Sequence, residues 1–154
     1  MTQTNPLPVL KRPRVRIGLA LTALGFFTFL LGADPGLFGL DRSPATGYLQ
    51  VLVFLVGLLV ICLGGYLALA GLWNGYEKTI IADIGLRLVG TGYVIAVGSG
   101  LADLLGLGTQ ASPKIPYFGP WQEGGVILGE IVIALGFLML IPSRLPHPKQ
   151  DPNQ

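Results

Sequence analysis

Two ionisable residues lie inside apolar stretches of the sequence, away from the ends where most charges occur. Glu130 is nine residues from Trp121 and eleven from Ile141, which puts it roughly 14–16 Å from either end of a helix that rises 1.5 Å per residue. Arg87 follows Asp83 by four residues, roughly 6 Å into a second such helix. A charge at the centre of a bilayer costs about 2.5–3.5 kcal/mol, so we expect both side chains to face protein.

Two more polar residues have a spacing that would bring them to the same place. Glu123 precedes Glu130 by seven residues and lies on the same helix face. Thr91 is one turn beyond Arg87, at about the depth of Glu130. We therefore predict a polar seam between the third and fourth helices, formed by Arg87, Thr91, Glu123 and Glu130. Arg87 either pairs with Glu130, reaches it through Thr91 or water, or extends back to the membrane surface.

Three roles are open for Glu130. A protonated carboxyl that is hydrogen-bonded to a neighbouring hydroxyl or carbonyl would hold helices together, since burial favours the neutral acid. A carboxyl that exchanges protons or binds a cation would mark a transport route. Contact with a partner subunit or a lipid is the third role, and we favour the first.

The sequence offers no set of residues for catalysis, for a metal or for a cofactor. The one histidine, His147, lies in the C-terminal tail, and the one cysteine, Cys62, cannot form an intrachain disulfide. A free cysteine inside an apolar stretch packs as a small hydrophobe. Neither a zinc-type ligand cluster nor a phosphate-binding glycine loop is present. We therefore expect no enzymatic activity, no cofactor and no nucleic-acid partner.

Four apolar stretches are long enough to carry these residues through a lipid bilayer. The chain has 154 residues, of which 51% are hydrophobic and 12% are charged, whereas about a quarter of a soluble domain is charged. A helix needs about 20 apolar residues to cross, and in lipid its backbone must bond internally. We predict an all-α integral membrane protein with a single domain at 17–141 and spans at about 17–33, 47–73, 84–107 and 121–141.

The two halves of this domain resemble each other. A shift of 72 places identical residues on Pro44, Gly47, Gln50, Gly57, Val60, Ile61, Leu63 and Gly64, and a shift of 67 does so for Ile17, Gly18, Leu19, Leu21 and Gly25. We predict two tandem two-helix hairpin repeats, at about 15–73 and 82–141. Because each repeat has two spans, the copies insert in the same direction, around a pseudo-two-fold axis along the membrane normal. Glu123, Glu130 and Arg87 fall on Val51, Leu58 and Ala20, so only the second hairpin carries these charges.

The basic residues predict the orientation of the chain. With the N-terminus inside, eight of the ten lysines and arginines lie on or near the cytoplasmic side, and only Arg42 and Lys114 lie outside. The positive-inside rule then predicts a multi-pass protein of the cell membrane with both termini in the cytoplasm. The segment 1–16 is the basic N-terminal segment, and the proline-rich tail 142–154 is predicted to be disordered.

Small residues recur at helical spacing in the spans. They form three stripes: Gly57, Gly64, Ala68 and Gly71; Gly92, Ala96 and Gly100; and Gly125 with Gly129. Such stripes let helix backbones approach closely, either within the bundle or, for one stripe, against a homodimer partner or a larger complex. The function that we expect is therefore a non-enzymatic accessory or assembly subunit that packs through small-residue helix faces in the lipid bilayer. The alternative is a small proton-coupled transporter or carrier that uses Glu130.

Two segments also resemble a known family. LRLVGTGYVIAVGSGLAD, with Arg87 early in a span, and GEIVIALGFLML, with Glu130 before a glycine-containing end, resemble the DoxX-like four-helix membrane proteins. The resemblance covers residues 84–141. It implies a four-helix membrane fold and no particular activity.

Overall fold

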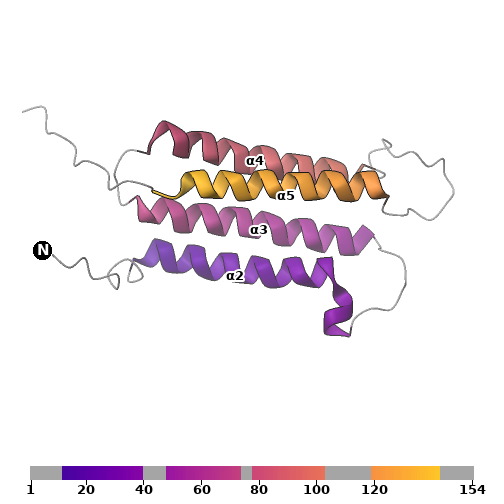
Figure 1. Ribbon diagram of the computed structural model, residues 1–154. Coiled ribbons are helices and arrows are strands. Elements are labelled where there is room, and N and C mark those ends of the chain that lie inside the picture. The colour runs from indigo at the N-terminus through magenta and orange to yellow at the C-terminus, as the bar shows by residue number, and fades with distance from the viewer. Residues whose placement is uncertain (1–11, 40–47, 74–77, 103–118, 143–154) are drawn as a thin grey trace, which may run out of the picture.

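The computed structural model describes residues 12–39, 48–73, 78–102 and 119–142. Its regular structure in these residues is helical. The elements are α2 (Pro13–Ala33), the short 3₁₀ helix η1 (Pro35–Phe38), α3 (Tyr48–Leu72), α4 (Ile80–Gly100) and α5 (Pro120–Leu140). Figure 1 shows the four long helices side by side. The prediction of four helices long and apolar enough to cross a membrane is confirmed in the described part of the chain.

The helices begin and end at residues with a local reason to do so. Pro13 and Pro120 each stand at the first helical position, where the missing N–H of proline is not needed and its fixed φ suits a helix. Thr79 Oγ1 accepts a hydrogen bond from Ala82 N at 3.2 Å, so α4 starts four residues before the expected span. It also ends early, at Gly100, after a Gly-Ser-Gly run of poor helix formers. The expected continuation at 103–107, the segment 1–11 and the tail at 143–154 lie outside the described residues.

The first hairpin consists of α2 and α3, which pack closely along their length. A Cβ atom built on Gly18 would lie 2.8 Å from Gly64 O, and one built on Gly64 would lie 2.8 Å from Gly18 O. Two helical turns further along α2, a Cβ on Gly25 would lie 3.0 Å from Gly57 O. Only glycine fits at separations this small, so the two backbones are in direct contact.

The second hairpin, α4 with α5, is built in the same way. A Cβ atom on Gly85 or on Gly136 would lie 2.6 Å from the carbonyl oxygen of the other. The same distance, 2.6 Å in both directions, relates Gly92 and Gly129. In each hairpin the paired glycines are seven residues apart on each helix, so they stay on one face over two turns.

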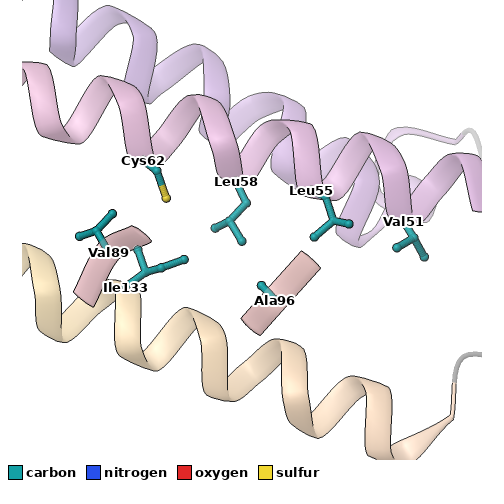
Figure 2. Close-up of a cluster of buried hydrophobic side chains, with 7 residues drawn as sticks. All are labelled: Val51, Leu55, Leu58, Cys62, Val89, Ala96 and Ile133. Carbon is teal, nitrogen blue, oxygen red and sulfur yellow. The ribbon is translucent and has the colours of Figure 1, made fainter. Parts of the chain in front are cut away.

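A third interface joins the hairpins, and α3 is at its centre. On the side away from the glycines, α3 contributes Val51, Leu55, Leu58 and Cys62 to a buried cluster with Val89, Ala96 and Ile133. Figure 2 shows these side chains between α3 and the helices of the second hairpin. At one end, Trp73 Nε1 donates a hydrogen bond to Leu140 O at 3.0 Å, and both residues are buried. This bond uses a carbonyl at the C-terminus of α5 that has no partner within the helix.

The two hairpins contribute unequally to this third interface. α3 packs on both α4 and α5, whereas α2 packs along α3 and makes at most isolated contacts with α4 and α5. A true two-fold relation between the hairpins would give α5 the same contact with α2 that α3 has with α4. That contact is missing, so α2 lies at the edge of the molecule, as Figure 1 shows.

Candidate functional site

Glu130 lies at the middle of α5, on its α3 side. The preceding residue, Gly129, faces α4, and successive helix residues differ by about 100°. Glu130 therefore shares a face with Phe137, seven residues later, whose ring packs against Gly65 of α3. The side chain is half-buried. No hydrogen bond or ion pair joins its carboxyl to any other described residue.

Arg87 takes its partner from its own helix. Its Nη2 lies 3.0 Å from Asp83 Oδ2, and its Nε donates to the same oxygen at 3.2 Å. The Arg87 side chain is 79% exposed. The direct pair with Glu130 is therefore absent from the structure. The physical reason is that Asp83 lies one turn away on the same face of α4, which is turned away from α5. The spacing of four between Asp83 and Arg87 was the signal for this pair in the sequence.

Thr91 and Glu123 have separate surroundings as well. Thr91 is exposed and its Oγ1 donates to Arg87 O at 2.9 Å. Glu123 is exposed in the first turn of α5, where the helix dipole favours a negative charge. No contact between described residues joins Arg87 or Thr91 to Glu123 or Glu130. The structure does not bring all four residues together, so the polar seam stays a prediction.

The small-residue stripes are used inside the chain. Gly57, Gly64 and Gly71 face α2; Gly92 and Ala96 face Gly129; Gly125 faces Ser99; and Gly100 faces Val51 and Leu55. The expectation that one stripe remains for a partner is therefore not met by these residues. Any partner of this chain must contact other surfaces.

The basic residues gather at one end of the molecule, which also carries Asp83. The starts of α2 and α4 meet the ends of α3 and α5 at one end (Figure 1). All the described basic residues lie there: Arg12, Arg14, Arg16, Lys78 and Arg87. Arg12 Nη1 donates to Gly71 O at 3.3 Å. Lys78 Nζ donates to Tyr66 OH at 3.3 Å and lies 4.8 Å from the centre of the Tyr66 ring.

The opposite end carries acidic groups in the described residues, namely Asp34 and Glu123. Asp34 ends α2, and its Oδ1 accepts a hydrogen bond from Leu37 N at 3.3 Å.

Among the residues that the structure describes, no three His, Cys, Asp or Glu side chains come together as metal ligands would. Cys62 is buried in the cluster of Figure 2. Glu130 is thus an acid at the middle of a long helix that no described residue bonds.

Comparisons of the chain with protein-family models, curated proteins and solved structures find no match.

Proposed function

We propose that this chain is a multi-pass cell-membrane protein that acts as a non-enzymatic accessory or assembly subunit. The observation that carries the proposal is Glu130, half-buried at mid-helix with no partner among the described residues. An acid inside a bilayer needs a hydrogen-bonding partner, because an unpaired polar group there is costly. A second molecule that meets this carboxyl would supply it. Assembly is therefore the role that these surroundings favour.

Membrane insertion has support from the outer surface. Large apolar side chains are exposed on all four long helices, for example Leu24, Leu63, Val94 and Ile131. Soluble proteins rarely expose contiguous apolar surface of this extent. The basic end would face the cytoplasm under the positive-inside rule, so the N- and C-termini would both be cytoplasmic.

The two hairpins are, in this proposal, copies of one unit. Shifts of 67 and 72 carry Gly18 and Gly64 onto Gly85 and Gly136, and both pairs are in backbone contact. Gly25 and Gly57 map in the same way onto Gly92 and Gly129. The pairing that holds each hairpin together is thus repeated with its spacing. Because α2 does not pack along α5, the pseudo-two-fold relation would be approximate.

A second candidate function is a small proton-coupled carrier. It rests on the same carboxyl, since the Glu130 side chain is only partly buried and intramembrane acids often mark proton or ion routes. A third candidate is a DoxX-like membrane protein, which rests on the resemblance over residues 84–141 alone.

Purification in mild detergent followed by mass spectrometry of the co-purifying proteins tests the proposal. A stoichiometric larger membrane protein is the result that we expect for an accessory subunit. If the chain instead purifies without a partner and drives proton-dependent uptake in liposomes that Glu130→Gln abolishes, the carrier function replaces it.

A further inference from the structure

The face of α3 that receives the second hairpin has a counterpart on α5. On α3, Val51, Leu55, Leu58 and Cys62 are all at most 9% exposed. α4 covers them together with Ile133 of α5, and Tyr93 OH of α4 reaches Leu55 O at 3.5 Å. The shift of 72 carries these four residues to Glu123, Ile127, Glu130 and Ala134 of α5.

This counterpart face of α5 is largely uncovered. Ile127 is 47% exposed, Glu123 and Ala134 are exposed, and Glu130 is half-buried. α3 covers this face of α5 only at its end, where Phe137 packs against Gly65. Along Glu123, Ile127 and Ala134 the face has no helix that covers it.

The covering face of α4 also has a counterpart, and it lies on α2. The shift of 67 carries Leu86, Val89 and Tyr93 back to Leu19, Thr22 and Phe26. Leu19 is 55% exposed and Phe26 is 54% exposed. Thr22 itself is half-buried beside Gly64 of α3. Because α2 packs along α3 and not along α5, the chain carries both halves of a second interface, and most residues of both halves stay exposed.

The two open halves match in polarity. Leu58 and Val89 belong to one buried apolar cluster (Figure 2), and their counterparts are Glu130 and Thr22. Thr22 Oγ1 donates its proton to Gly18 O at 2.9 Å, so its remaining capacity is that of an acceptor. A protonated carboxyl is a donor. An apolar pair in the first interface thus corresponds to a donor and an acceptor in the second.

We propose that α5 of one copy packs against α2 of a second copy, with the Glu130 carboxyl donating a hydrogen bond to Thr22 of that copy. The interface repeats between chains the contact that α3 makes with α4 within the chain. It is head-to-tail, so copies form a closed ring when the rotation closes. The inference rests on the membrane insertion and the repeat proposed above.

Cysteine cross-linking in native membranes tests it, in a Cys62→Ala background that removes the chain's one cysteine. Two differently tagged chains are co-expressed, one with Phe26→Cys and the other with Ile127→Cys, the counterparts of Tyr93 and Leu55. The expected result is an oxidant-dependent dimer that carries both tags. The matched control pair is Leu24→Cys with Leu128→Cys, which are similarly exposed on other faces of the same two helices and should not cross-link.

A second set of variants tests the polar pair itself. Glu130→Leu or Thr22→Val alone should lower the cross-linked fraction about 2- to 10-fold, which corresponds to one hydrogen bond. The two changes together recreate the Leu58 and Val89 pair and should restore cross-linking. Glu130→Gln keeps a donor and should retain it.

Three outcomes would overturn the proposal. They are an equal yield from the control pair, no dimer although both tagged chains are in the membrane, and an internal disulfide without dimer when one chain carries both Phe26→Cys and Ile127→Cys. None of these depends on whether a larger protein co-purifies, so failure here is distinct from failure of the accessory role. A chain that alkali extracts from membranes would instead contradict the membrane insertion.

Discussion

At the residue scale, Arg87 and Glu130 illustrate what residue spacing along the sequence can predict about a side chain and what it cannot. Glu130 is ten residues from either end of α5, as counting predicts. Arg87 is seven residues into α4, deeper than counting from Asp83 predicts, because α4 begins at Ile80. Their partners do not follow from counting alone, because the rotation of each helix about its axis decides which face meets which neighbour. That rotation is set by the glycine pairs, which turn Arg87 outward to Asp83.

The separation of these two side chains predicts that their effects on stability are independent. Arg87→Leu, Glu130→Leu and the double change should give additive changes in the free energy of unfolding, within about 0.5 kcal/mol. Thermal unfolding in detergent is the measurement. A coupling energy well above that value would show that the two side chains interact, as the predicted polar seam requires.

Trp73 is a second feature at this scale, and an aromatic residue at the end of a span was its one signal in the sequence. Trp73→Phe removes the donor to Leu140 O and leaves a buried carbonyl without its partner. We expect a loss of about 1–3 kcal/mol, measured as a lower unfolding temperature in detergent. Trp121→Phe is the matched control, because Trp121 is 90% exposed. An equal effect of the two changes would show that the hydrogen bond contributes nothing.

At the scale of elements, the small-residue stripes were visible in the sequence, but their partners were not. A stripe shows that a close approach occurs and leaves open which helix makes it. The structure pairs Gly57 and Gly64 with α2, and Gly92 with Gly129 of α5. The bounds of α3 and α5 were predicted to within one residue, and the starts of α2 and α4 to within four. The largest difference is at the end of α4, where the Gly-Ser-Gly run stops the helix before the apolar stretch ends.

The glycine pairs predict a sharp contrast within one helix. Gly92→Ala places a Cβ 2.6 Å from Gly129 O, and we expect it to lower the free energy of unfolding by about 1–3 kcal/mol, as overpacking does. Gly90→Ala meets nothing within 4 Å and should be neutral or stabilise by up to about 1 kcal/mol, because alanine favours helix. Thermal unfolding of the two variants side by side is the check. Similar losses for both would mean that the hairpin is not held by backbone contact.

At the scale of the whole molecule, the two helical hairpins and the gathering of basic residues were both suggested by the sequence. The position of α2 at the edge was not, since no pattern in one helix states how two hairpins are rotated against each other. All the basic residues that the structure describes lie at one end, and this predicts the topology. Reporter fusions after Gln154 and in the loop at 74–77 should read cytoplasmic, and fusions near Arg42 and Lys114 should read external. A cytoplasmic signal near Lys114 would contradict the orientation.

The central claim at this scale is that the single chain is incomplete without a further protein chain. This claim links the unpaired Glu130 to an assembly role. Native mass spectrometry of the protein released from membrane vesicles tests it most directly. We expect species heavier than the 16.3 kDa chain, containing further copies or a larger partner, and a shift toward the single chain in Glu130→Leu. A wild-type protein that is released only as a 16.3 kDa monomer would contradict the claim.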